Sequence, residues 1–160
     1  MKPILLRSCA RVIALFLPVF MAGTPSALAS DLVSSSPEGA AVYFIEPQDG
    51  QVVGPDFTVK FGLKGMGVAP AGTIKDNTGH HHILIDLEEL PDLTQPLPAT
   101  EQIKHFGGGQ TEAELSLPVG SHTLQLLLGN YAHVPHDKPL VSEKITVVVK
   151  ETVKLDLFQQ

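Results

Sequence analysis

Histidine is the side chain whose number and placement in this sequence could do chemistry. Seven histidines occur among 160 residues, and all seven fall in one part of the chain. They are His80, His81, His82, His105, His122, His133 and His136. Neutral imidazole is the commonest metal ligand near neutral pH and also a versatile hydrogen-bonding group. This concentration therefore predicts either a metal site or a polar network.

Spacing singles out five of the seven as candidate ligands. His80 and His82 are two residues apart, so in a strand they share one face at a separation of about 7 Å. His133 and His136 are three apart in a proline-containing loop that can turn both rings inward, and His105, beside three glycines, can close the set. Without cysteine, such a site suits Cu(II) or Zn(II). The predicted metal ligands are His80, His82, His105, His133 and His136.

Other residues receive supporting roles. We expect Asp86 or Asp137 to orient the ligating rings by accepting their second N–H. His81 shares its face with Ile83 and is expected to be a hydrogen-bonded structural residue. His122 follows a turn at the place where sandwich domains often carry a tyrosine corner, which predicts a structural hydrogen bond. A polar network that joins three loops would use the same histidines as a metal site, so both interpretations stay open.

The N-terminal residues 1–29 predict a secretory signal. Lys2, Arg7 and Arg11 precede an apolar run at 12–21, and Ala27 and Ala29 supply the small residues of a cleavage site. The apolar run is much shorter than the roughly 20 residues that span a bilayer. We therefore expect export to the periplasm or medium of a bacterium, with no membrane association after cleavage.

Composition after cleavage excludes several classes of function. Removing residues 1–29 removes three basic residues and no acidic ones, so the net charge changes from −6 to −9. No arginine and no cysteine remain, which excludes nucleic acid as a partner and thiol chemistry as a mechanism. Met66 is the only remaining methionine, which argues against a Cu(I) carrier built on thioethers. No catalytic constellation is present, so we expect a protein that is not an enzyme.

Short apolar or alternating runs predict the fold. They occur at 42–45, 57–63, 82–87, 112–117, 122–128 and 144–149, separated by turns rich in glycine and proline. With a short strand near Ile103, they predict an all-β, antiparallel immunoglobulin/fibronectin-like β-sandwich of about seven strands. The predicted divisions are a flexible leader at 30–40, the sandwich at 41–150 and a tail at 151–160.

The predicted topology also positions the histidines. Alternation places Leu124, Leu126 and Leu128 on the core side of their strand, and Ile83 and Ile85 on the core side of theirs. In such a sandwich, the loops after the second, fourth and sixth strands gather at one pole. Six of the seven histidines are then expected at that pole, and His122 at the other.

Several segments resemble a known family. They are Asn77–Asp86 (NTGHHHILID), His105–Glu112 (HFGGGQTE), Gly120–Gly129 (GSHTLQLLLG), His133–His136 (HVPH) and Gly65–Gly72. Together they resemble a family of small secreted bacterial proteins catalogued as a domain of unknown function. The resemblance implies a secreted bacterial domain whose histidines belong to the family pattern, and it implies no substrate.

Two functions follow from these observations as expectations. The first is an exported, non-enzymatic sandwich that binds a divalent transition metal at its histidine-rich pole. The second is an interaction module of the cell envelope, with a protein, glycan or small-molecule ligand and with histidines that only fix its loops.

Overall fold

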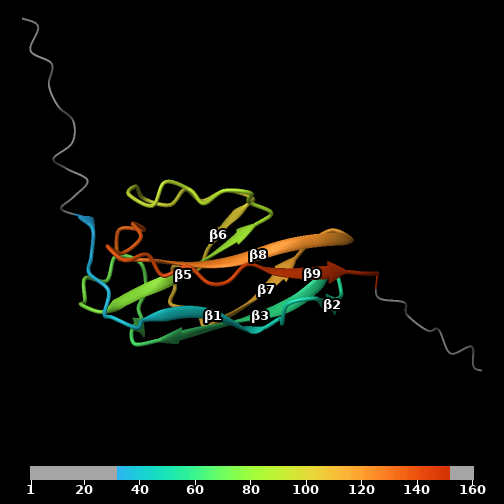
Figure 1. Ribbon diagram of the computed structural model, residues 1–160, viewed down its shortest axis with the longest axis horizontal. Helices are drawn as coiled ribbons and strands as arrows, with labels where there is room; N and C mark the ends of the chain where they lie inside the picture. The colour runs from blue at the N-terminus through green and yellow to red at the C-terminus, as the bar shows by residue number, and fades with distance from the viewer. Residues whose placement is uncertain (1–31, 152–160) are drawn as a thin grey trace, which may run out of the picture.

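The computed structural model describes residues 32–151, which form two packed β-sheets. Figure 1 shows the layers, with β1 and β3 below β5, β8 and β9. The predicted signal peptide and residues 152–160 of the predicted tail lie outside the described residues. No helix within residues 32–151 is long and apolar enough to cross a membrane. The prediction of an all-β sandwich is confirmed, while its immunoglobulin or fibronectin type stays a prediction.

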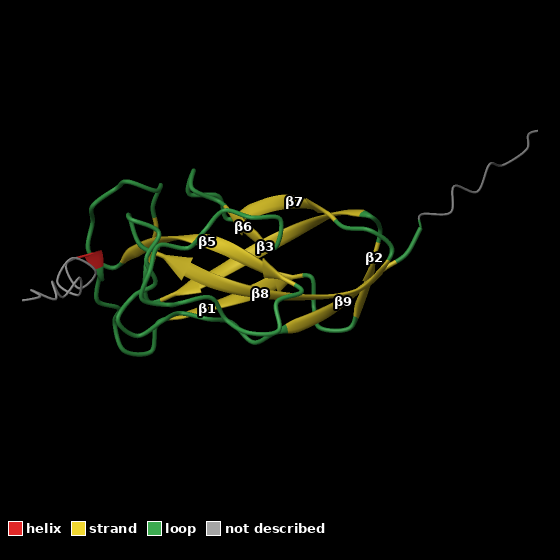
Figure 2. Cartoon of the chain, turned by 90° about the horizontal axis from the view of Figure 1, so that it is seen from above, coloured by secondary structure: helices red, strands yellow, loops and turns green. Residues whose placement is uncertain are grey.

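The smaller sheet has three antiparallel strands and the larger sheet six. The smaller has the order β1 (Ala41–Glu46), β3 (Asp56–Lys64) and β7 (Glu112–Ser116). The larger has the order β2 (Gln51–Val53), β9 (Ile145–Val149), β8 (Gly120–Gly129), β5 (Thr78–Ile85) and β4 (Gly67–Val68). β6 (Ile103–His105) also pairs with β5. In Figure 2 the strands run along the length of the molecule, with loops gathered at its two ends.

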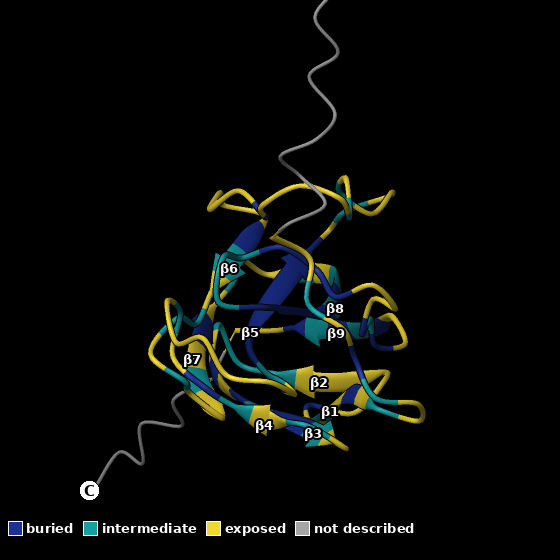
Figure 3. Cartoon of the chain, turned by 90° about the vertical axis from the view of Figure 1, so that its left-hand side faces the viewer, coloured by how far each residue is buried: buried dark blue, intermediate teal, exposed yellow. Residues whose placement is uncertain are grey.

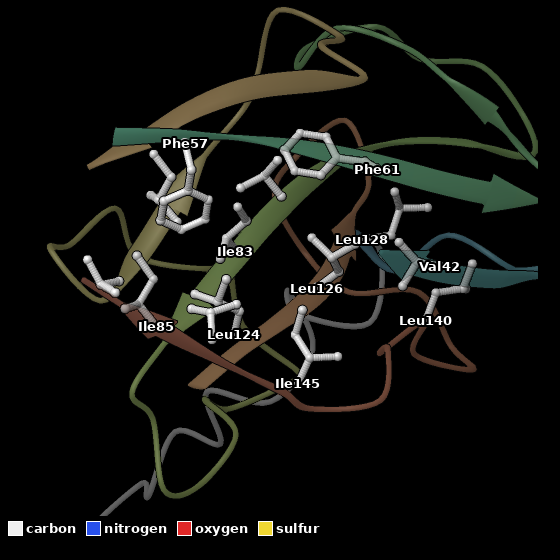
Figure 4. Packing of buried hydrophobic residues seen from close by; sticks show 14 residues of the cluster. Val42, Phe57, Phe61, Ile83, Ile85, Leu124, Leu126, Leu128, Leu140 and Ile145 are labelled. Carbon is white, nitrogen blue, oxygen red and sulfur yellow. The ribbon is translucent and has the colours of Figure 1, made fainter. Parts of the chain in front are cut away.

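The main core lies between the two sheets. Leu124, Leu126 and Leu128 of β8 point into it, as do Ile83 and Ile85 of β5 (Figure 4). They pack against Phe57, Val59 and Phe61 of β3. The predicted phases of both strands are confirmed, because alternation with a period of two decides which side chains leave water.

A second apolar cluster covers the outer face of the larger sheet. It contains Leu84, Leu97, Ile103 and Leu127. The segment after β5, yellow-green in Figure 1, lies on the side of the sheet away from β1 and β3. Strand β5 is consequently buried on both faces and is dark blue in Figure 3. Leu84 points away from the main core but is apolar, because the outer face of β5 is also covered by apolar side chains.

The strands differ from the expected set in two respects. The described residues form nine strands and not about seven, and the additional ones are the short β2 and β4. Strand β5 runs over Thr78–Ile85 and not over 82–87, so the three consecutive histidines lie within it. A hydrophobicity pattern does not reveal this part of the strand, because its buried side chains are polar imidazoles.

The described part of the expected leader is held against the domain. The Asn130 side-chain amide donates to the Leu32 carbonyl oxygen at 2.6 Å and to Ser34 Oγ at 3.1 Å. The Ser36 backbone N–H donates to Asp137 Oδ1 at 2.9 Å. Residues 32–36 therefore differ from the flexible segment that a serine-rich composition predicts, because the loop between β8 and β9 offers them hydrogen-bond partners.

Candidate metal centre

Four imidazoles from three segments meet on the outer face of the larger sheet. His80 and His82 project from β5, and the antiparallel register places His105 of β6 directly opposite His82. The loop after β8 brings His133 to the same place. We call His80, His82, His105 and His133 the histidine cluster. Its ring centroids are 4.7 to 6.1 Å apart, and five of the six pairs lie within 5.1 Å.

The nitrogens of the histidine cluster are close enough to serve one ion. His80, His82 and His105 each offer a ring nitrogen, and these three atoms lie within 4.8 Å of one another. His133 Nε2 lies 3.1 Å from His105 Nε2. Nitrogens that bind a tetrahedral zinc ion at 2.0–2.1 Å are about 3.4 Å apart, so modest ring rotations would suffice. The histidine cluster could hold a metal ion.

Two glycines leave room for the rings. A Cβ at Gly129 would lie 2.7 Å from His82 Cε1. A Cβ at Gly107 would overlap the His105 ring. Side chains at these two positions would displace the imidazoles, so the glycines belong to the construction of the site. The spacing of the histidines indicates neither glycine as part of the site.

Hydrogen bonds hold His133 in an unfavourable backbone conformation. Its φ is 65°, in the left-handed region that costs a non-glycine residue about 1 kcal/mol or more. The His133 N–H donates to the Asn130 carbonyl oxygen at 2.9 Å, and the His133 carbonyl accepts from the Leu97 N–H at 3.0 Å. Asn130 Oδ1 also accepts from the N–H groups of Ala132 and Val134. These bonds fix the loop that directs His133 toward the other rings.

The two rings from β5 are buried without hydrogen-bond partners. His80 is 0% exposed and His82 is 1% exposed. Within residues 32–151, none of their four ring nitrogens has a partner. An unpaired buried polar group costs about 1–3 kcal/mol, so this arrangement is unfavourable for folding alone. Its lone pairs are instead available to a ligand.

Burial also keeps these rings neutral. Desolvation, helped by repulsion from His133 and His105, lowers the pKa of His80 to about 4. Desolvation, helped by repulsion from His80 and His105, lowers the pKa of His82 to about 3. Partial burial and the neighbouring His133 lower the pKa of His105 as well. At neutral pH the imidazoles are in the unprotonated form that binds metals.

His136 lies outside the histidine cluster. Its Nε2 donates to the Thr78 carbonyl oxygen at 3.2 Å, and its side chain is buried beside the start of β5. One nitrogen is thus engaged by the backbone of the strand that carries His80. The structure therefore does not bring the His136 ring together with the other four predicted ligands.

The expected carboxylate supports are directed elsewhere. Asp86 Oδ2 accepts from His122 Nδ1 at 2.7 Å, and Asp86 Oδ1 accepts from the Thr123 N–H. Asp137 Oδ1 accepts from the N–H groups of Ser36 and Lys138. The expectation that either aspartate orients the metal-binding rings is therefore wrong, because backbone donors and His122 occupy them.

The two remaining histidines have structural positions. His81 packs on Phe61 in the main core at a centroid distance of 4.9 Å, and neither ring nitrogen has a partner within residues 32–151. Its expected hydrogen bond is therefore wrong, and desolvation lowers its pKa to about 4. His122 lies at the far end of β5, and its Nε2 donates to the Pro118 carbonyl oxygen at 2.9 Å. Its predicted corner hydrogen bond is confirmed.

Comparison with known proteins gives a family but no activity. No curated protein matches the chain in sequence. The X-ray structure of the endo-beta-1,4-mannanase from Thermotoga petrophila is similar over 71% of this chain and 20% of that one, with 16% identity and a TM-score of 0.43. The family described as "Domain of unknown function (DUF4399)" matches residues 59–150, a stretch that includes all seven histidines. The chain belongs to this family.

Proposed function

We propose that this chain is an exported protein that binds a transition-metal ion of the Cu(II) or Zn(II) class through the histidine cluster. The observation that carries the proposal is the pair His80 and His82, which is buried with no partner on any ring nitrogen in the part of the chain that the structure describes. One ring nitrogen from each lies within 4.8 Å of the other and of one from His105, which is close enough for a shared metal ion. A ligand that accepts the lone pairs would offset the desolvation of both rings.

A purely structural network is less well supported. Histidines that only fix loops should each bond a carbonyl or carboxylate, as His122 does with both of its ring nitrogens. In the histidine cluster the one hydrogen bond between side chains joins His105 to His133, ring to ring. A metal ion would replace that bond with two coordinate bonds and would also engage His80 and His82.

Access and coordination favour binding over catalysis. His105 is exposed and His133 is partly exposed, while His80 and His82 lie beneath them. An ion can therefore reach the outer rings first and then the buried pair. Four protein ligands would leave no open position for water or substrate, which is typical of metal sites that are not catalytic. The signal peptide that the sequence predicts supports a location in the periplasm or medium of a bacterium.

Calorimetric titration of the tag-free chain with Cu(II) and Zn(II) tests the proposal. We expect one ion per chain with a Kd below about 100 μM at pH 7. His80→Ala should abolish the binding, while His122→Ala, which removes a histidine at the other end of β5, should leave it intact. Absence of binding, or binding that survives His80→Ala, would contradict the proposal and favour an interaction module with a protein, glycan or small-molecule partner.

A further inference from the structure

We propose that the histidine cluster is a copper site that binds Cu(I) more tightly than Cu(II) or Zn(II), because its ligands are imidazoles without a carboxylate, its four rings are nearly equidistant, and it borders an apolar layer. This inference rests on the proposed function and specifies the ion and its oxidation state. Two independent features of the structure support it, the charge of the site and its shape.

The ligand set supplies no negative charge. The group of potential ligands found in the described residues consists of histidines alone. The two aspartates that the sequence suggests as supports for the ligands, Asp86 and Asp137, accept hydrogen bonds from other residues. A bound ion would therefore keep its full charge. Because the cost of burying an ion rises with the square of its charge, a divalent ion is penalised about four times as much as a monovalent one.

The surroundings strengthen that penalty. Leu84 follows His82 by two residues on the same face of β5, and it packs with Leu97, Ile103 and Leu127. Ile103 lies two residues before His105 on β6. The histidine cluster thus borders an apolar layer, where charge is poorly solvated.

The shape of the site is closer to a tetrahedron than to a square. Four rings at the corners of a square would show two diagonal distances about 1.4 times the four sides, the arrangement that Cu(II) prefers. Here five centroid distances lie between 4.7 and 5.1 Å, and one, His82 to His133, is longer at 6.1 Å. Four nearly equidistant groups suit ions with filled d shells, which are Cu(I) and Zn(II). The lower charge of Cu(I) then favours it over Zn(II) at this site.

A preference for Cu(I) differs from what the sequence alone predicts. The lack of several thioether ligands argues against Cu(I) when only ligand softness is considered. Met66 does not alter that point, because it packs against the main core on the other side of the larger sheet. Charge and shape act independently of softness: the shape of the site disfavours Cu(II), and its lack of negative charge disfavours both divalent ions.

Three titrations of the full chain test the inference. Cu(I) affinity is measured without oxygen, in excess ascorbate, by competition with a coloured Cu(I) chelator. Cu(II) and Zn(II) affinities are measured by calorimetry. We expect a Kd for Cu(I) at least about 100-fold below that for Cu(II). That ratio raises the copper reduction potential by about 120 mV over the value for copper in water, at 59 mV per tenfold.

A charge substitution at the exposed ligand provides the sharper test. His105→Asp adds an anionic ligand, so the preference for Cu(I) over Cu(II) should fall at least about tenfold. His105→Asn, which removes the imidazole but adds no charge, should weaken both ions and leave the ratio within about threefold. Since His105 is exposed, both variants should fold, which circular dichroism checks.

The outcomes separate this inference from the proposed function. If Zn(II) or Cu(II) binds more tightly than Cu(I), the inference is overturned while the proposed function stands. If the two His105 variants change the ratio equally, the charge argument is wrong. If no ion binds in any titration, the proposed function itself fails, and the inference fails with it.

Discussion

Histidines near the two ends of β5 are in opposite states. Toward one end, His80 and His82 are buried and neutral and have no partner among residues 32–151. Beyond the other end, His122 donates one ring N–H to Asp86 and the other to the Pro118 carbonyl oxygen. Partial burial opposes protonation of His122, but the bonds to Asp86 and Pro118 outweigh it and raise its pKa. The same side chain is thus a candidate ligand at one end and a structural hydrogen-bonding group at the other.

The hydrogen-bond partners of a histidine, and not its residue type, determine whether it can bind a metal ion or serves a structural role. An imidazole that donates from both nitrogens has no lone pair to offer and is cationic. Rings that share their space only with other rings and apolar groups keep their lone pairs. The carboxylate of Asp86 makes the difference, because it lies at the His122 end and not at the end that holds the histidine cluster.

The largest effect is expected from removing a buried ligand. His82→Leu should raise the Kd for metal at least about 100-fold. It should also stabilise the metal-free chain by about 1–3 kcal/mol, because an unpaired buried ring is replaced by an apolar side chain that extends the cluster of Leu84. Calorimetry and urea unfolding measure the two effects.

His81→Leu is the matched control for that prediction. His81 is equally buried and unpaired, but it faces the main core. The substitution should stabilise the chain without changing the Kd for metal. If His82→Leu destabilises the metal-free chain, the account of unused lone pairs is wrong.

A smaller loss is expected when a ring is displaced and not removed. Gly107→Ala places a Cβ where the His105 ring lies and should weaken metal binding about tenfold. Gly108→Ala meets only the flexible end of Gln110 and should have no effect. Neither glycine has a positive φ, so backbone strain does not confuse the comparison. Equal affinities for the two variants would show that His105 does not bind the ion.

Acid should destabilise the metal-free chain through the histidine cluster. The pKa values of His80 and His82, about 4 and 3, lie below the unfolded value of 6.5. The unfolded chain therefore binds more protons, and stability falls as the pH falls from about 6.5 toward 4. Urea unfolding at several pH values should show a shallower fall for His82→Leu. An identical slope in both proteins would contradict the lowered pKa of His82.

The smallest effect, with the opposite pH dependence, is expected at His122. A raised pKa means that its contribution is fully present below pH 6.5 and disappears as the pH rises through the folded value. His122→Gln should therefore destabilise the chain by less than about 1 kcal/mol at pH 5.5, and by less still at pH 8.5. Thermal unfolding at the two pH values checks this. A larger loss at the higher pH would contradict the ion pair with Asp86.

The sequence could predict the meeting of the four rings but not their partners. Spacing put His80 and His82 on one face, and topology brought His105 and His133 to the same end of the sandwich. His136 is predicted as a ligand on the same grounds as His133, and the backbone carbonyl of Thr78 engages its Nε2 instead. Which carbonyl or carboxylate a ring meets depends on register and loop conformation, and neither has a periodic signal in the sequence.

The fold, too, is predictable from the sequence only in part. Strands with one face toward the core, such as β3 and β7, are predicted to within two residues, because their alternation is visible. Strand β5 was misplaced because it is buried on both faces, and one of those faces carries imidazoles. The covering of Leu84 and Leu127 by the segment after β5 depends on an irregular chain, which no pattern predicts.

X-ray absorption by the copper-loaded chain shows whether the histidine cluster binds the ion, because it identifies and counts the ligands. We expect three or four imidazole nitrogens at about 2.0 Å. We also expect that His82→Leu removes the imidazole signature while His81→Leu retains it. Copper bound mainly by oxygen, or an unchanged spectrum in His82→Leu, would contradict the assignment of the histidine cluster as a metal centre.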